Sequence, residues 1–204
     1  MATGDVGTYE GYGFRLAAST GALTGTVNGS IFTFRNSTAN RKVRILAVNV
    51  NASEGTVWST PGIATLSMVV ARSFTASDTT GTALSGLSAG NNSNKLRTGQ
   101  PASFILTGGG DVRVATTAAL TAGTRTLDSN AVGNIVCGSS AANSNMIQDV
   151  PLYSDYTTIY GIPLVLAQNE GFVINANAAA GTGTWQVGVS VLYAEVDGGA
   201  AGTG

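Results

Sequence analysis

The segment Thr184–Val196 constrains the fold more than any other part of the chain, because its apolar residues alternate without interruption. Alternation with a period of two is the pattern of a β-strand that buries one face. Near its end the opposite side becomes apolar too, which indicates a cover on both sides there, such as another subunit. The buried face is expected to hold Trp185, Val187, Val189, Val191 and Tyr193, and the second apolar side Leu192, Ala194 and Val196.

The rest of the chain also favours strands, and few stretches show the helical spacing of apolar residues. A hairpin is expected from Ile162–Ala167 to Gly171–Asn175, because Asn and Gly in the turn supply the backbone geometry of a tight connection. With Thr184–Val196 it would form an antiparallel meander. Val43–Val50 is apolar on both faces and is expected to be buried on both. The other expected strands are Ser30–Phe34 and Thr65–Ser73, with weaker candidates at Ala102–Leu106, Val112–Ala115 and Ile159–Tyr160.

Several short strands with Gly-rich turns indicate an all-β, antiparallel sandwich or barrel. Strands that are apolar on both faces and long polar loops favour a jelly-roll-like sandwich. The 204 residues suit one such domain over 1–197, with an N-terminal arm at about 1–16 and a flexible Gly-rich tail at 198–204. Two polar segments, Thr75–Gln100 and Thr116–Ser129, are expected to be long loops that lie on neighbouring subunits. Because aromatic residues are only 7% of the chain, the core is expected to be aliphatic.

Charged residues are scarce, with 10 Lys and Arg against 11 Asp and Glu. This argues against a nucleic-acid partner, because phosphate binding requires clustered Lys and Arg. The one dense basic group, Arg41-Lys42-Arg44, is interpreted as a solvated strand entry, with a nucleic-acid contact as the alternative. No apolar run approaches the ~20 residues of a membrane span, and the first residues do not read as a secretory signal. Synthesis in the cytoplasm and no membrane partner are therefore expected.

The chain has no histidine, which removes the commonest general base and the usual zinc ligand. Cys137 is interpreted as a small buried apolar residue, because no histidine could activate its thiol. Asp149, Asp155 and Glu170 could converge as the carboxylates of a glycosidase do. A calcium ion could be bound by Asp128, Asp149 and Asp155. The simpler interpretation, ordinary surface acids, is favoured, so no enzyme activity, cofactor or metal is expected.

Two aromatic groups are candidates for contacts with other subunits, since Tyr and Phe are favoured interface anchors. The group near the N-terminus is either a docking arm or a strand packed on its own sheet. The group after residue 149 would serve as an interface or as a sugar-stacking platform, and an interface is favoured. With the second apolar side of the last strand included, the expected interface residues are Tyr9, Tyr12, Phe14, Tyr153, Tyr156, Leu192 and Val196.

The end of the chain, Ile162–Ile174 followed by Gly183–Glu195, resembles the ending of small virion proteins of tailed bacteriophages. The shared pattern is a strand, an Asn-Glu-Gly turn at Asn169–Gly171, a second strand and a Thr-Trp-x-Val-x-Val strand, over about residues 158–196. The resemblance implies a structural virion protein, such as a capsid decoration or accessory head protein that stabilises the shell. The alternative is a tail, collar or fibre protein that contacts other virion proteins or a host glycan. It implies no catalytic residues.

The expected partners are therefore other virion proteins, either the major capsid protein or the tail and collar proteins. A homo-oligomer is expected as well, because the second apolar side of the last strand needs a cover. A trimer is the form expected from the way jelly-roll virion proteins commonly associate. Two further classes, a carbohydrate-active enzyme and a coat protein that encloses nucleic acid, remain as rivals, the latter disfavoured by the missing basic arm.

Overall fold

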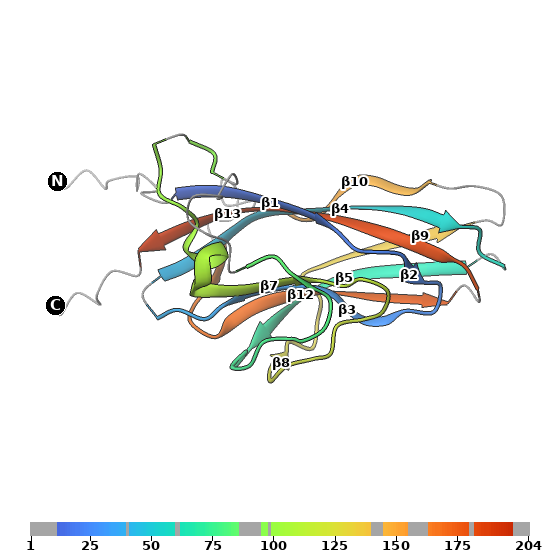
Figure 1. The fold of residues 1–204 in the computed structure, drawn as a ribbon, viewed down its shortest axis with the longest axis horizontal. Helices are drawn as coiled ribbons and strands as arrows, with labels where there is room; N and C mark the ends of the chain where they lie inside the picture. The colour runs from blue at the N-terminus through green and yellow to red at the C-terminus, as the bar shows by residue number, and fades with distance from the viewer. Residues whose placement is uncertain are drawn as a thin grey trace.

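The computed structural model describes residues 12–39, 41–59, 62–85, 95–97, 99–139, 145–154, 163–179 and 182–197, which form two β-sheets packed face to face (Figure 1). Sheet A contains, in spatial order, β1 (Tyr12–Ser19), β13 (Thr184–Asp197), β4 (Arg41–Thr56) and β10 (Asn145–Ser154), with β2 (Leu23–Thr24) beside β13 and β11 (Leu164–Leu166) beside β4. Sheet B contains β6 (Thr82–Ala83), β7 (Gly110–Val114), β3 (Asn28–Asn36), β12 (Glu170–Ala179) and β5 (Gly62–Arg72), with β8 (Thr126–Leu127) and β9 (Gly133–Ser139) both beside β5. Within the described ranges, no helix is both long and apolar enough to cross a bilayer.

The long strands pair in a nested order, β1 with β13, β3 with β12, β4 with β10 and β5 with β9, and every pair is antiparallel. The first strand thus pairs with the last, and each inner pair follows in turn. Successive pairs belong alternately to sheet A and sheet B, which is the arrangement of a double-sheet jelly roll. The predicted all-β, antiparallel, jelly-roll-like sandwich is confirmed.

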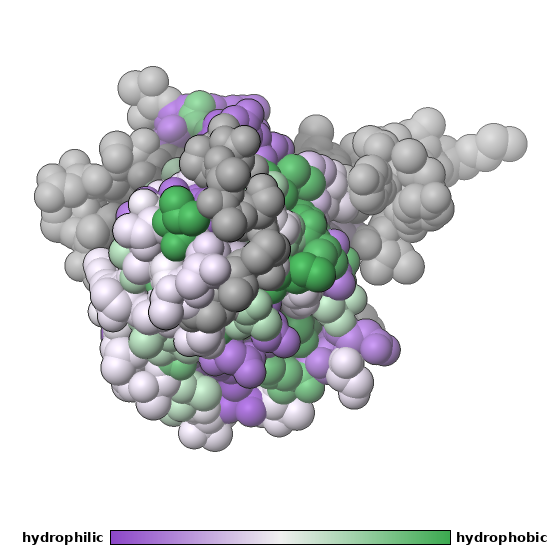
Figure 2. All heavy atoms as spheres, turned by 90° about the vertical axis from the view of Figure 1, so that its right-hand side faces the viewer, coloured by the Kyte–Doolittle hydropathy of each residue, from purple (hydrophilic) through white to green (hydrophobic). Residues whose placement is uncertain are grey.

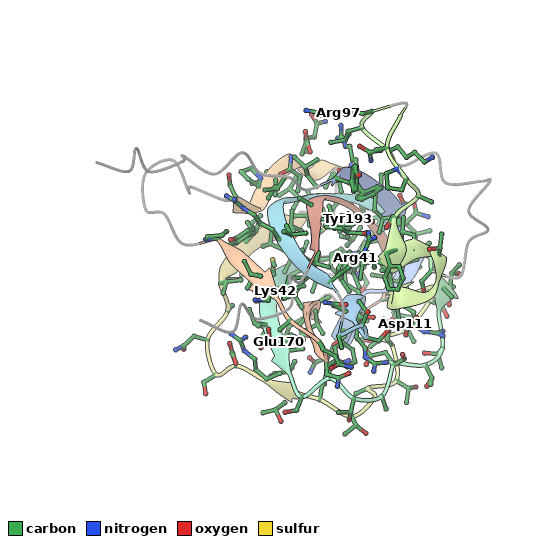
Figure 3. The ribbon with its side chains drawn as sticks, turned by 90° about the vertical axis from the view of Figure 1, so that its left-hand side faces the viewer. Arg41, Lys42, Arg97, Asp111, Glu170 and Tyr193 are labelled. Atoms are coloured by element: carbon green, nitrogen blue, oxygen red, sulfur yellow. The ribbon has the colours of Figure 1, made fainter. Side chains whose placement is uncertain are left out.

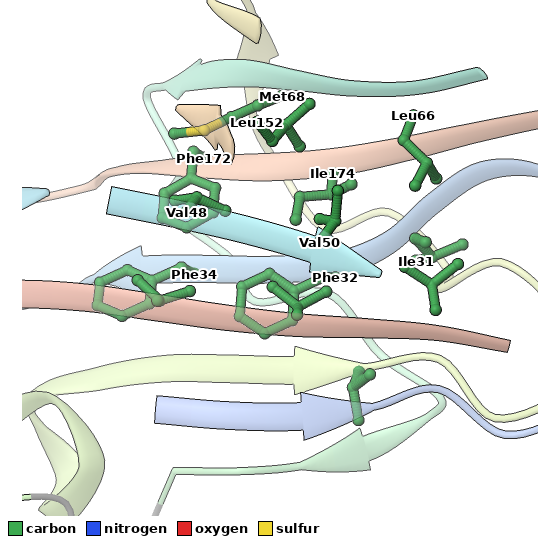
Figure 4. Close-up of a cluster of buried hydrophobic side chains, with 14 of the residues drawn as sticks. Ile31, Phe32, Phe34, Val48, Val50, Leu66, Met68, Leu152, Phe172 and Ile174 are labelled. Carbon is green, nitrogen blue, oxygen red and sulfur yellow. The ribbon is translucent and has the colours of Figure 1, made fainter. Parts of the chain in front are cut away.

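The core lies between the two sheets and includes the predicted buried face of β13, from Trp185 to Tyr193. Figure 4 shows aromatic and aliphatic side chains of β3 and β12 beside those of β4. Although aromatic residues are few, they concentrate here: Phe34 stacks on Phe172 at a centroid distance of 5.4 Å and meets Tyr193 edge-on at 5.2 Å. The expected aliphatic core therefore has an aromatic centre.

The buried apolar residues of β4 lie on one face, although Arg44 on the other face is buried too, and the prediction of two buried apolar faces is wrong. Its register against β13 shifts between the pairs Ala47–Leu192 and Ile45–Tyr193, so Leu46 is an extra residue. A bulge of this kind changes which alternate residues point inward. The buried residues before the bulge are odd-numbered, and those after it are even-numbered: Val43 and Ile45, then Val48, Val50 and Ala52.

The expected hairpin and meander at the end of the chain are also wrong. β11 pairs with β4 in sheet A, whereas β12 pairs with β3 and β5 in sheet B, so the turn after Ala167 crosses between the sheets. Asn169 does have the positive φ expected of this turn, at 57°. Because β13 returns to sheet A, the three consecutive strands β11, β12 and β13 alternate between the two sheets instead of pairing with each other.

The weaker strand candidates have mixed outcomes. Val112–Ala115 is confirmed, since it overlaps β7. Ala102–Leu106 is wrong, because a helical turn, Ile105–Gly109, begins within it. The buried Ser103 stabilises this turn, with its hydroxyl accepting the Leu106 N–H at 3.2 Å. Ile159–Tyr160 and the Gly-rich tail lie outside the described residues.

Most of the described residues of the two polar segments lie on the outer face or at the edge of the protein's own sheet B, whereas residues 95–97 and 100 lie beside β1 of sheet A. Phe74 packs there on Val69, Ala71 and Val173 in a second, smaller apolar cluster. The two segments join through backbone hydrogen bonds, such as Thr75 N–H to Thr124 O at 2.9 Å and Thr79 N–H to Thr121 O at 2.9 Å. In these parts the loops pack on their own sheets, and contact of their outer side with neighbouring subunits stays a prediction.

Candidate interaction surfaces

The N-terminal aromatic group is divided by the structure. Phe14 lies in β1, is fully buried and stacks on Tyr193 at a centroid distance of 5.5 Å. It therefore belongs to the protein's own core, and its assignment as an interface residue is corrected. Residues 12–16 of the expected arm are likewise part of sheet A. Tyr12 is exposed at the start of β1 and stays a predicted contact, whereas Tyr9 lies outside the described residues.

The other expected interface residues lie on or beside sheet A. Tyr153 in β10 is half-buried, and its hydroxyl accepts the backbone N–H of Leu164 at 3.0 Å. Leu192 and Val196 are half-buried on the outer face of β13, opposite the core. Tyr156 lies outside the described residues. These assignments remain predictions.

The acidic candidates do not form one site. Asp149 lies on β10 of sheet A, whereas Glu170 begins β12 of sheet B. Glu170 and Asp128 both bind Arg72, at 2.6 and 3.4 Å, so their charges are already paired. Asp155 lies outside the described residues. In the part of the chain that the structure describes, no three acidic or cysteine side chains come close enough together to hold a metal ion.

The predicted burial of Cys137 is confirmed. Its side chain lies between the sheets, and the thiol donates a hydrogen bond to the carbonyl oxygen of Ala64 at 3.3 Å. Burial disfavours the charged thiolate and raises the pKa of Cys137 to about 11. A thiol in this state is a poor nucleophile at neutral pH.

The basic group at the start of β4 is part of the protein's own framework. Arg41, labelled in Figure 3, contacts the carboxylate of Glu195 at 3.4 Å and lies over the Phe104 ring at 5.3 Å. Arg44 is buried. Lys42 is exposed, as a solvated strand entry predicts. Two of the three charges are therefore not available as a cluster for phosphate binding.

Glu195 is a buried carboxylate that sequence reasoning missed. It accepts the Ser103 hydroxyl at 2.6 Å and the backbone N–H groups of Phe104 and Ile105 at 2.8 and 3.0 Å. It thereby fixes the helical turn between β6 and β7 to the end of β13. The available signal was its position, because Glu195 continues the alternating face of β13 that is buried up to Tyr193.

A shallow hollow of about 370 Å³ lies on the outer face of sheet A, over the end of β1 and the middle of β13 and β4. Asp149 borders it from a bulge in β10, with a positive φ of 40°, and accepts a hydrogen bond from the Asn49 amide at 3.2 Å. Gly188 forms part of the floor, since a Cβ there would lie 2.1 Å from the Asn51 amide oxygen. Short side chains complete the lining: Ala17, Ala18, Ser19 and Ser190.

Exposed aliphatic side chains gather toward the end of the sandwich where β4 finishes and β5 starts. Val57, Ile63 and Val136 have exposed fractions of 60%, 61% and 62%. Ile63 and Val136 are diagonal neighbours on the outer face of sheet B, because Val136 pairs with Thr65. Figure 2 shows this end, with hydrophobic residues in green among pale, weakly polar ones. Exposed aliphatic groups on this scale favour contact with other proteins.

No protein-family model matches the chain, and neither a curated protein nor a solved structure is significantly similar to it.

Proposed function

We propose that the protein is a structural component of a bacteriophage particle, acting as a decoration or accessory head protein that binds and stabilises the assembled shell. The observation that carries the proposal is a double-sheet jelly roll with an aliphatic, charge-poor end. Jelly rolls are a common architecture of virion proteins, and aliphatic surface at one end fits docking on other subunits. The phage-like pattern at the end of the chain supports the same role.

The described chemistry favours binding over catalysis. Glu170 and Asp128 are paired with Arg72, and Glu195 is buried in a hydrogen-bonded structural site. Of the three carboxylates considered for a glycosidase, the two within the described ranges, Asp149 and Glu170, lie on different sheets, whereas a glycosidase needs two carboxylates about 5–10 Å apart.

Mass spectrometry of purified particles of the phage that encodes the chain tests the proposal. A head protein should be present at a fixed, high ratio to the major capsid protein. Particles assembled with Val57→Asp should lose the protein, because a carboxylate in an apolar contact is costly to desolvate. Thr82→Asp, exposed on β6, is the matched control and should be retained. Absence of the wild-type protein from the particles would refute the virion role.

The hollow on sheet A favours a second candidate, a tail or fibre protein that contacts a host glycan. Its rim offers an amide and a carboxylate in Asn49 and Asp149, and planar polar groups of this kind can bind neighbouring sugar hydroxyls. Its floor of short side chains leaves room for a sugar ring.

Binding to an array of bacterial surface glycans, together with particle copy number, separates the two candidates. The second candidate predicts a few copies per particle and glycan binding that is lost in Ala17→Trp, which fills the exposed floor. Ser53→Trp, on β4 outside the hollow, should bind as the wild type does. A high copy number without glycan binding would exclude the tail or fibre role and support the role in the shell.

A further inference from the structure

The outer edge of β9 in sheet B is paired with no strand in the described part of the chain, although β10 of sheet A approaches β9 at Gly133. β9 pairs with β5 along one side, over Gly133–Ser139. It contains neither a charged residue nor a proline. Such an edge presents unpaired backbone N–H and C=O groups and is a template for another strand.

The direction of these backbone groups follows from the hydrogen bonds of β5. The carbonyls of Met68 and Val70 accept the N–H groups of Val132 and Asp128 at 2.8 and 2.9 Å, so even-numbered residues of β5 face this side. Their partners in β9 are the odd-numbered residues. Because antiparallel pairs alternate, the N–H and C=O groups of Asn134, Val136 and Gly138 point away from β5. All three residues are exposed.

The longer strands β1, β10 and β7, which lie at or next to the other edges of the sheets, each carry some protection. The start of the β1 edge is covered by residues 95–97 and 100, where the Leu96 N–H and the Gln100 amide both donate to the Gly13 carbonyl, at 3.3 and 2.6 Å. β10 contains three register shifts and Pro151. β7 is bordered by β6 and carries the Asp111–Arg113 ion pair. Bulges, prolines, charges and covering segments are the ordinary means of preventing edge pairing, and β9 shows none of them among the described residues.

We propose that β9 pairs with β9 of a second copy of the chain, antiparallel, about a two-fold axis at Val136. Val136 is the middle residue of the strand, so it would face its own counterpart. Asn134 would then lie opposite Gly138, and the three outward residues would form backbone hydrogen bonds with the same three residues of the other copy. The result is one continuous sheet that runs through both sandwiches.

A second copy fits this edge for three reasons. The strand is uncharged, so two identical strands meet without like-charge repulsion. The two exposed Val136 side chains would cover each other on the outer face, with Ile63 of each copy beside them. Each copy uses the same edge, which closes the assembly at two subunits. The expected form is thus a dimer, in contrast to the trimer expected from the sequence.

The molecular mass in solution and disulfide cross-linking test the dimer together. In a Cys137→Ala background, Val136→Cys should form a disulfide-linked dimer under mild oxidation, because directly paired residues have Cα atoms about 5.5 Å apart, within disulfide range. Asn134→Cys in the same background is the control. Its two copies would be four residues out of register, about 13 Å apart at ~3.3 Å per residue, and should not cross-link.

Light scattering should give a mass of two chains for the wild type and one chain for Val136→Lys, with Val136→Thr still dimeric. A wild-type monomer, a trimer without Val136→Cys cross-linking, or equal cross-linking of Val136→Cys and Asn134→Cys would each overturn the proposal. A wild-type monomer whose Val136→Lys variant is lost from particles would assign the edge to another virion protein, which also overturns it. The dimer does not require the virion role, so a dimer absent from particles would refute that role alone.

Discussion

Trp58 and Trp185 meet edge to face, with ring centroids 6.2 Å apart and planes at 88°, and both are fully buried. Trp185 begins β13 in sheet A, and its indole N–H donates to the Thr24 carbonyl at 3.1 Å. Trp58 follows β4, in the connection to β5 of sheet B, and its backbone N–H is bound by the Glu54 carboxylate at 2.7 Å. The pair therefore fills the core where the chain passes from one sheet to the other.

Trp185→Ala should destabilise the protein by about 3–5 kcal/mol, because it removes a buried Trp and leaves a cavity. Because the total stability of a protein is about 5–15 kcal/mol, this loss should leave the variant unfolded or only marginally stable. Thermal melting measures the effect. Gln186→Ala, an exposed neighbour in the same strand, is the control and should stay within ~0.5 kcal/mol of wild type. A wild-type melt for Trp185→Ala would contradict its place in the core. Asp155→Ala is likewise expected to do little.

Asp78→Asn should be far more damaging than Asp128→Asn, although each removes one carboxylate that binds an arginine. The side chains of Asp78 and Arg125 are 0% and 5% exposed, and Arg125 also donates to Ser30 on β3 at 2.8 Å. Breaking this pair leaves a buried charge unpaired, at a cost of about 3–5 kcal/mol. Arg72 and Asp128 are 45% and 40% exposed, so their pair contributes about 0–1 kcal/mol. Equal losses of stability in urea unfolding would show that the Asp78–Arg125 pair is solvated.

Much of the fold could be predicted because the residues of β13 alone indicate which side of the strand is buried. Its period-two pattern defines a buried face that is independent of which strands lie beside it. The jelly roll was also expected, although one reason for it, the two buried faces of β4, does not hold. The extra residue at Leu46 changes which residues of β4 point inward, and the local pattern of hydrophobic residues does not indicate such a bulge.

Strand partners were harder to predict than strands. The turn at Gln168–Gly171 has the chemistry of a hairpin, with Asn169 at positive φ, yet it carries the chain from sheet A to sheet B. Pairings such as β1 with β13 join residues at opposite ends of the chain, and neither partner's sequence specifies the other. The hollow on sheet A was missed for the same reason, since it combines residues of four strands.

Gly133→Ala should destabilise the protein because the new methyl group would strike backbone. A Cβ at Gly133 would lie 1.7 Å from the carbonyl oxygen of Leu152, at the point where β9 and β10 approach each other. Relief requires a shift of one strand, so a loss of about 1–3 kcal/mol is expected. Gly99→Ala is the control, since no atom lies within 4 Å of its Cβ position. Chemical denaturation of both variants measures the difference, and equal stability would mean that the strands separate freely there.

The stability of the wild-type protein should fall between about pH 9 and pH 11 more steeply than that of Cys137→Ala. Burial raises the pKa of the Cys137 thiol from its ordinary value near 9 to about 11. In this interval the unfolded chain loses the thiol proton while the folded protein keeps it, so unfolding is favoured as the pH rises. The contribution is complete below about pH 9, is lost through about pH 11, and amounts to on the order of 2 kcal/mol. Urea unfolding of both proteins at about pH 7.5 and about pH 10.5 measures it, because the two proteins differ only at residue 137. Parallel pH profiles would mean that the thiol reaches solvent in the folded state, and rapid modification by a thiol reagent at neutral pH would show this directly.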